Sequence, residues 1–415
     1  MIIPFAEWLP DQPTLEGGGA KIAKNVIPAA NSYLPFPGPE VASDALDSTP
    51  RGSIALRESD DDVKIFAGDQ NKLYQLVDGS FTDVSKSGGY VTDNLFWEFQ
   101  RWGDKVIAVT KGEPPQIIDM TTGGNFADLG GTPPEARHIA VVRDFVVLGN
   151  LVESGTPYAN KLRWSGINDE TDWAPSAATQ SDSQILQGDG GFIQAIVGGE
   201  YGVIIQDNSI WRMTYVGPPV VFQFDEVETG RGTNAPNSVV SLGSMVFYLG
   251  KDGFYVFDGN SSKNISANKV SDYFYDDLDV SYQQDITAAI DPKNTLVIWN
   301  YHSIANTGTP DKQIIFNWTT GRWSFAENDL IQVNYSRQSA YTLDSMDTVL
   351  ASIDDPAPSF DSRFWKGGAI LLSGFNTDNK MVVFTGDALS GVIETDEKQL
   401  SPGMRSLVTG IRPLV

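Results

Sequence analysis

The residue types that most often carry catalysis or metal binding are scarce in this chain. Its 415 residues include no cysteine and only two histidines, His138 and His302. Without cysteine there is no disulfide and no thiol nucleophile, and a structural zinc site with four Cys or His ligands is excluded. His138 follows Pro133-Pro134 at the start of an expected strand, and His302 ends another. Each is interpreted as an ordinary strand-end residue rather than a catalytic base.

Carboxylates are abundant but not arranged in a recognisable site. A glycosidase needs two carboxylates at a suitable separation, a condition that 53 acidic residues meet trivially. Two clusters, Asp60-Asp61-Asp62 and Asp276-Asp277-x-Asp279, offer the oxygen ligands that Ca²⁺ prefers. Neither has the spacing of an EF-hand loop, so solvated loop acids are the favoured interpretation. The phosphate loop GxxxxGK[ST], the GxSxG elbow and HExxH are all absent. We expect no enzyme, no cofactor and no metal.

The formal net charge is −24, from 29 basic and 53 acidic residues. Proteins that bind DNA gain affinity by neutralising phosphates with Lys and Arg, so this balance argues against ordinary DNA binding. It remains compatible with a wall past which DNA slides without sticking. The same charge also favours solubility.

The elements expected to position these residues are short apolar runs separated by Gly, Asn and Asp. Asp78-Gly79 and Asp258-Gly259 lie between β-formers and are hairpin signals. The inner strands of seven such units begin near Lys64, Val106, Phe145, Val203, Met245, Leu296 and Ala369. Upstream strands are expected at 53–57, 96–101, 139–143, 192–197 and 286–290, and a short helical turn at 271–278.

A repeat of about 40–60 residues with up to four short strands is typical of β-propeller blades. The sequence therefore predicts an all-β fold, a propeller of about seven blades, with six as the alternative. A β-sandwich or several stacked β-domains is the competing fold.

Three regions are expected along the chain. Residues 1–50 are predicted to form an extended arm because closely spaced Pro and Gly oppose both helix and central strand. The propeller would span 51–395, and 396–415 reads as an exit strand or the start of a further β platform or tip region. The arm would pack on its own propeller or on a neighbouring subunit. No targeting segment and no apolar run of 18 residues is present, so membrane insertion is not expected.

Three groups of sequence stretches resemble one protein family. They are Trp8-Leu-Pro-Asp-Gln-Pro13 with Asn25-Val-Ile-Pro28 and Tyr33-Leu-Pro-Phe-Pro37; 163–173 with 202–212 and 215–219; and 235–239 with 246–259. Shorter matches lie at 384–386 and 393–395. In these stretches the chain resembles the β-propeller tail-tube proteins of short-tailed bacteriophages, also called nozzle, hub or packaged-DNA stabilisation proteins.

The resemblance implies a structural protein of the virion. Such proteins form a ring, usually of six copies, that continues the DNA channel below the portal and the adaptor or head-completion protein. The ring carries fibres or tailspikes and closes against a needle or plug until ejection. DNA would pass through the lumen without specific binding. On this basis the lumen-facing surface is expected to be more acidic than the outside.

The arm is expected to reach the adjacent subunit or the adaptor. The residues predicted at that interface are Trp8, Leu9, Pro10, Asp11, Pro13, Tyr33 and Phe36, together with Arg412 in the C-terminal strand. Removing Met1 to Pro37 is expected to abolish ring attachment and to leave the propeller folded. Two alternatives stay open. One is a tail-associated propeller that binds or degrades carbohydrate through a central pocket of aromatic residues and carboxylates. The other is a scaffold propeller that binds host peptides.

Overall fold

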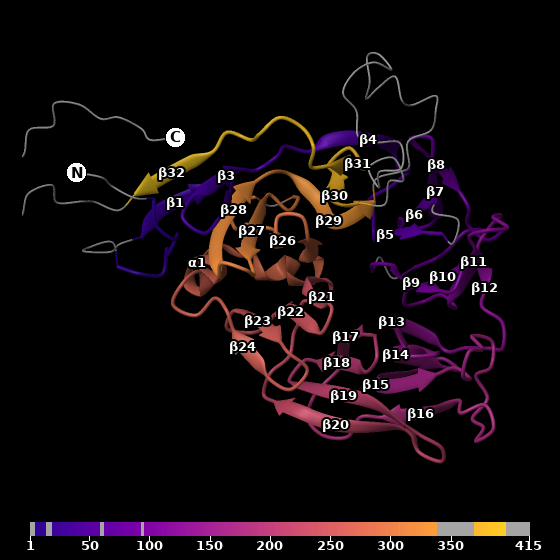
Figure 1. Cartoon of the computed structure of the whole chain (residues 1–415). Helices are drawn as coiled ribbons and strands as arrows, with labels where there is room; N and C mark the ends of the chain where they lie inside the picture. The colour runs from indigo at the N-terminus through magenta and orange to yellow at the C-terminus, as the bar shows by residue number, and fades with distance from the viewer. Residues whose placement is uncertain are drawn as a thin grey trace, which may run out of the picture.

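The computed structural model describes residues 5–13, 19–58, 62–92, 95–306, 308–337 and 369–395. Strands account for 52% and helices for 5% of the structure, and the strands form seven small sheets arranged as the blades of a propeller (Figure 1). The predicted all-β propeller is confirmed, with seven blades rather than six. No helix in these ranges is both long and apolar enough to cross a membrane.

Blades 1 to 3 follow one another along the chain. Blade 1 contains β5 (Ser53–Arg57), β6 (Val63–Gly68), β7 (Leu73–Val77) and β8 (Ser80–Asp83). Blade 2 contains β9 (Glu98–Trp102), β10 (Lys105–Val109), β11 (Gln116–Asp119) and β12 (Ala127–Asp128). Blade 3 contains β13 (Glu135–Val142), β14 (Phe145–Glu153), β15 (Thr156–Trp164) and β16 (Asp182–Ile185). Each is an antiparallel meander in which consecutive strands are hydrogen-bonded neighbours.

Blades 4 and 5 repeat this order. Blade 4 contains β17 (Ile193–Val197), β18 (Gly202–Gln206), β19 (Ser209–Gly217) and β20 (Val221–Thr229). Blade 5 contains β21 (Val240–Leu242), β22 (Met245–Leu249), β23 (Phe254–Phe257) and β24 (Ser262–Asn264). The 3₁₀ helix η1 (Pro236–Ser238) precedes β21, and α1 (Ser271–Asp277) with η2 (Val280–Asp285) joins blade 5 to blade 6. Helix α1 confirms the short helical turn predicted there.

Blades 6 and 7 also take strands from the N-terminal region. Blade 6 contains β25 (Thr287–Asp291), β26 (Leu296–Tyr301), β27 (Lys312–Asn317) and β28 (Arg322–Glu327), followed by β1 (Ala20–Lys24) and β32 (Val392–Thr395). Blade 7 contains β29 (Leu330–Arg337), β30 (Ile370–Asn376), β31 (Lys380–Val383) and, as its outer strand, β4 (Glu40–Ala45). Strands β2 (Val26–Pro28) and β3 (Tyr33–Pro35) form a separate hairpin.

Strand β4 closes the ring by joining the two ends of the chain in one sheet. It pairs antiparallel with β31, with Lys380 opposite Ala45 and Val383 opposite Glu40. Strand β1 similarly lies between β28 and β32, parallel to the first and antiparallel to the second. Residues 20–45, in the region predicted as an arm, therefore supply strands to blades 6 and 7.

The hydrophobic core is divided among the spaces between blades. Seven clusters of buried residues occur in the described part of the chain, one between each pair of adjacent blades. Strand β10 shows why. Val106 and Ala108 pack toward blade 1, whereas Ile107 and Val109 pack toward blade 3, because successive side chains point to opposite faces of a strand. Each fully buried aliphatic side chain contributes about 1.5–3 kcal/mol, so blade-to-blade packing is a major source of stability.

The strands nearest the central axis are not the ones that the sequence predicts. The strands predicted as inner, such as those beginning at Val106 and Phe145, are the second strands of their blades, and the upstream strands line the central axis. Second strands are covered by neighbouring blades on both faces, so they are the most continuously apolar. First strands border the central cavity and include polar residues, as Glu98-Phe-Gln-Arg-Trp102 in β9 shows.

Candidate functional site

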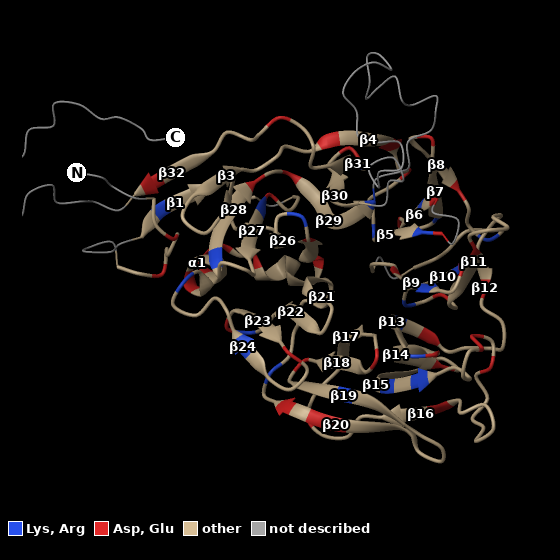
Figure 2. Cartoon of the chain, viewed as in Figure 1, with Lys and Arg blue, Asp and Glu red and all other residues tan. Residues whose placement is uncertain are grey.

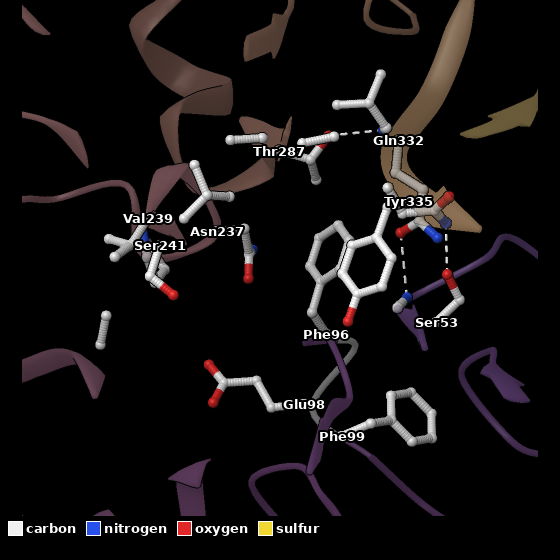
Figure 3. Close-up of a pocket in the computed structure, with 18 of the residues that line it drawn as sticks. Ser53, Phe96, Glu98, Phe99, Asn237, Val239, Ser241, Thr287, Gln332 and Tyr335 are labelled. Atoms are coloured by element: carbon white, nitrogen blue, oxygen red, sulfur yellow. Dashed lines mark hydrogen bonds between the residues drawn. The ribbon is translucent and has the colours of Figure 1, made fainter. Parts of the chain in front are cut away.

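The central axis of the propeller contains a cavity of about 430 Å³ (Figure 3). The first strand of every blade, from β5 to β29, contributes to its wall. Because each blade presents the same strand to the axis, residues far apart in the sequence meet there. This cavity is the candidate site that the fold itself creates.

Two aromatic side chains point into the cavity from different blades. Phe96 comes from the segment before β9, and Tyr335 comes from β29 (Figure 3). Desolvation raises the pKa of the Tyr335 hydroxyl, although the residue as a whole is 38% exposed. The Arg51 guanidinium lies 5.4 Å from the centroid of the Phe96 ring and 3.3 Å from the Asp285 carboxylate. The Arg51 cation, which does not itself line the cavity, is therefore already paired with both a ring and an acid.

Glu98 and His138 form the most chemically suggestive pair at this wall. The Glu98 Oε1 atom lies 2.6 Å from His138 Nδ1, and Glu98 Oε2 accepts a hydrogen bond from the Ile139 backbone N–H at 3.1 Å. The His138 side chain is 1% exposed, and its Nε2 atom has no partner among the described residues. The pair orients an imidazole, but the buried ring is withdrawn from the open part of the cavity.

The remaining polar groups of the wall join blades to one another. Gln332 Oε1 accepts the Gly52 N–H at 3.1 Å, and Thr287 Oγ1 accepts the Val333 N–H at 3.0 Å. Asn334 donates to the Ser53 hydroxyl (Figure 3). These bonds connect blades 6, 7 and 1 around the axis, so they stabilise the closed ring.

The chemistry available at the axis is limited. Among the described residues that line the cavity, Glu98 is the only carboxylate. Hydrolysis of a glycosidic bond by the usual mechanism needs two, so this lining does not supply a glycosidase pair. The described ranges also contain no group of three or more acidic or His residues placed to hold a metal ion. The cavity has the volume of a small-ligand pocket, about 300–1,000 Å³, which is far too small for a DNA duplex.

The second histidine and the acidic clusters have structural partners. His302 is 4% exposed, and its ring stacks on Tyr282 at a centroid distance of 4.2 Å. Burial lowers the pKa of His302, although nearby aspartates oppose the shift. Asp277 accepts hydrogen bonds from the Tyr301 hydroxyl at 2.8 Å and from Lys312 Nζ at 2.9 Å. Asp60 and Asp61 lie outside the described residues.

Two of the residues predicted at an intersubunit interface are buried within the chain. Trp8 and Phe36 are each 1% exposed. Trp8 packs against Phe325, with a centroid distance of 5.1 Å, and Phe36 packs against Phe384 at 5.4 Å. Removing Met1 to Pro37 would take both side chains and β1 out of the core. The expectation that this truncation leaves the propeller folded is therefore not supported.

The other predicted interface residues lie at or near the surface. The Tyr33 hydroxyl donates to the Ala6 carbonyl at 2.8 Å, and burial raises its pKa to about 12. Asp11 accepts hydrogen bonds from two backbone N–H groups at the start of α1. Leu9 and Pro10 are half-buried and Pro13 is exposed. Arg412 lies outside the described residues. The interface assignment stays a prediction for these positions.

Acidic and basic residues are interspersed along the ribbon of the propeller rather than divided into one acidic and one basic half (Figure 2). Many cations are paired: Lys86 lies 2.9 Å from Glu113 and 3.0 Å from Asp128. Lys161 Nζ lies 2.6 Å from Glu153, which Arg163 also approaches at 3.3 Å. Ion pairs engage at least 14 of the 24 Lys and Arg side chains in the described ranges, which reduces the number of basic groups that could attract a polyanion.

The fold defines the chain as a seven-bladed β-propeller. No protein-family model and no curated protein matches it. Similar solved structures include the extracellular domain of a protein described as a one-component system of B. thetaiotaomicron, with 11% identity and a TM-score of 0.48, over 83% of this chain and 39% of that chain. Another is the computationally designed Ika8 protein, with 11% identity and a TM-score of 0.43, over 92% of this chain and 96% of that chain. The chain thus spans about two fifths of the bacterial chain that it matches.

Proposed function

We propose that the chain is a structural virion protein that forms the tail nozzle ring of a short-tailed bacteriophage. The ring would continue the DNA channel below the portal and adaptor, retain packaged DNA, let it pass during ejection, and anchor fibres or tailspikes. The observation that carries the proposal is the placement of the resembling stretches. Residues 163–173 lie at the end of β15 and in the loop after it, 202–212 in β18 and β19, and 246–259 in β22 and β23. The likeness therefore extends over consecutive blades instead of a single loop.

The surface charge is the physical support for this function. A wall with a net charge of −24 per copy offers phosphates few basic contacts, so DNA gains little by adhering to it. The central cavity of about 430 Å³ cannot admit a duplex. In this proposal DNA passes between copies of the protein, through the lumen of the ring, and the propeller axis is not a conduit.

The test is the composition and imaging of purified phage particles that contain this chain. We expect mass spectrometry to find the chain in the tail, and electron imaging to show a ring, six-fold in the simplest case, below the portal. Absence of the chain from purified particles would exclude the proposal. A ring whose lumen has a basic surface potential would overturn the account of DNA passage, even if the ring itself were present.

A further inference from the structure

A second cavity, of about 500 Å³, lies on the outer half of blade 4 and shares no lining residue with the central cavity. Its floor is one face of the β19–β20 hairpin, and its rims are turns of blades 3, 4 and 5. We call it the blade-4 groove and define it by its floor residues Arg212, Thr214, Gln223 and Asp225. Nothing in the proposed ring function uses it.

The floor presents four polar side chains in a regular array. In the β19–β20 ladder Arg212 is opposite Asp225, and Thr214 is opposite Gln223. Because alternate residues of a strand share a face, these four side chains project from the same side of the sheet. The array offers a guanidinium, a hydroxyl, a carboxamide and a carboxylate, and so combines hydrogen-bond donors with acceptors.

These groups are held in place before any ligand arrives. Arg212 donates to Asn260 Oδ1 at 3.0 Å and lies 3.7 Å from the Asp225 carboxylate. Gln223 Nε2 donates to Asp225 Oδ1 at 2.8 Å. Side chains that are already ordered lose little conformational entropy on binding, so the groove is preorganised.

The rims add two more recognition groups. The Arg143 guanidinium lies 4.9 Å from the centroid of the Tyr215 ring, with Nε 3.6 Å from the Glu200 carboxylate. On the opposite side, Tyr201 reaches the turn at Gly259, where an added Cβ would lie 2.5 Å from the tyrosine hydroxyl. Only glycine leaves room for this hydroxyl at the edge of the groove, and no hydrogen bond of the hydroxyl is found within the described residues.

The charge and polarity of the groove select the class of ligand. Two arginines face Glu200, Asp225 and Asp258, so the lining is close to neutral and slightly acidic. The net negative lining gives a polyanion no advantage, and an apolar ligand would displace the water that hydrates these polar groups without replacing its hydrogen bonds, which is costly. A sugar ring carries adjacent hydroxyl groups, each of which both donates and accepts a hydrogen bond. Such hydroxyl pairs match the planar guanidinium, carboxamide and carboxylate groups on the floor of the groove. We propose that the blade-4 groove binds a neutral oligosaccharide.

The test uses the whole chain and an array of immobilised neutral and acidic oligosaccharides, followed by calorimetric titration with the soluble glycan that gives the strongest signal. We expect at least one neutral glycan to bind. Arg212→Ala and Gln223→Ala should each weaken binding at least tenfold, and Tyr201→Phe, which removes one hydroxyl at the edge of the groove, about threefold. Arg231→Ala is the control for the loss of an arginine, because Arg231 does not line this groove.

The proposal is overturned if no neutral glycan binds above background, if acidic glycans alone bind, or if the groove variants bind as tightly as the wild type. Melting temperatures of all variants separate lost binding from lost folding, and the mild Tyr201→Phe change keeps the test decisive if a floor variant unfolds. The groove belongs to a single chain, so a failure of glycan binding leaves the ring proposal standing, and the absence of a ring leaves the groove proposal standing.

Discussion

Trp8 provides the sharpest test of where the N-terminal segment docks. Its indole is 1% exposed and packs on Tyr273 and Phe325, with centroid distances of 5.0 and 5.1 Å. The indole N–H donates to the Lys21 carbonyl at 3.2 Å. All of these partners belong to the same chain. If Trp8 is an intramolecular anchor, its removal must destabilise the isolated protein without any partner present.

The size of the effect follows from these contacts. Replacing a buried Trp by Ala loses the transfer free energy of the ring and leaves a cavity, together about 3–5 kcal/mol. Two aromatic pairs at about 0.5–1.5 kcal/mol each and a hydrogen bond at about 1 kcal/mol lie within that total. We therefore expect Trp8→Ala to lower the free energy of unfolding by about 3–5 kcal/mol.

The assay is guanidinium unfolding followed by circular dichroism, which reports the sheets rather than a single fluorophore. Phe5→Ala is the control, because Phe5 is 48% exposed and should change the stability by less than about 0.5 kcal/mol. A loss below about 1 kcal/mol for Trp8→Ala would refute the intramolecular assignment. It would return Trp8 to the role predicted from the sequence, as an anchor on a neighbouring subunit.

Two further changes test the electrostatics and the backbone of the fold. Burial lowers the pKa of His302, so the folded state binds a proton at this ring less readily than the unfolded chain does. The stability that the protein gains from burying a neutral His302 is therefore complete above about pH 6.5, the unfolded pKa, and is lost as the pH falls below it. Unfolding of His302→Gln, measured with denaturant at pH 7.5 and 5.5, should therefore depend less on pH than unfolding of the wild type, and equal pH dependence would contradict the assignment. Gly131 and Gly79 have nearly equal φ values of +78° and +79°, but a Cβ at Gly131 would lie 1.5 Å from the Thr171 carbonyl oxygen, whereas at Gly79 nothing lies within 4 Å. Gly79→Ala should lower the free energy of unfolding only by the strain of a left-handed alanine, about 1–2 kcal/mol, and Gly131→Ala should lower it at least twice as much. If thermal or chemical unfolding gives equal losses for the two variants, Gly131 does not lie this close to the Thr171 carbonyl.

The repeat of the fold is readable from the sequence because each second strand is buried on both faces. Runs such as residues 106–109 of β10 are therefore continuously apolar, and the spacing of such runs predicts the blades. The closure of the ring is not readable in this way. Strand β4 pairs with β31 across more than 300 residues, and an apolar pattern does not specify which distant strand is the partner. For the same reason the sequence does not predict that β1 and β32 join blade 6.

The candidate sites were less accessible to sequence reasoning than the fold. Glu98 and His138 lie 40 positions apart and meet only because first strands of adjacent blades border one axis. The blade-4 groove draws on turns of three blades, so no local motif marks it. The one readable signal is the alternation of polar residues at Arg212 and Thr214 with buried or aromatic neighbours in β19, which indicates a strand with one polar face.

The structure changes how the negative charge of the chain is understood. The lining of the central cavity contains one carboxylate among its described residues, so the acidic residues of the described chain are not concentrated around this cavity. At physiological ionic strength the screening length is about 8 Å, so this charge acts on DNA only at close range. A wall of this kind does not hold DNA at a distance. In the proposed ring, pairs such as Lys86 with Glu113 and Lys161 with Glu153 would leave fewer basic groups to bind phosphate where DNA touches the wall. In a nozzle ring, the property that lets DNA pass would therefore be the pairing of its lysines and arginines as much as its excess of acids.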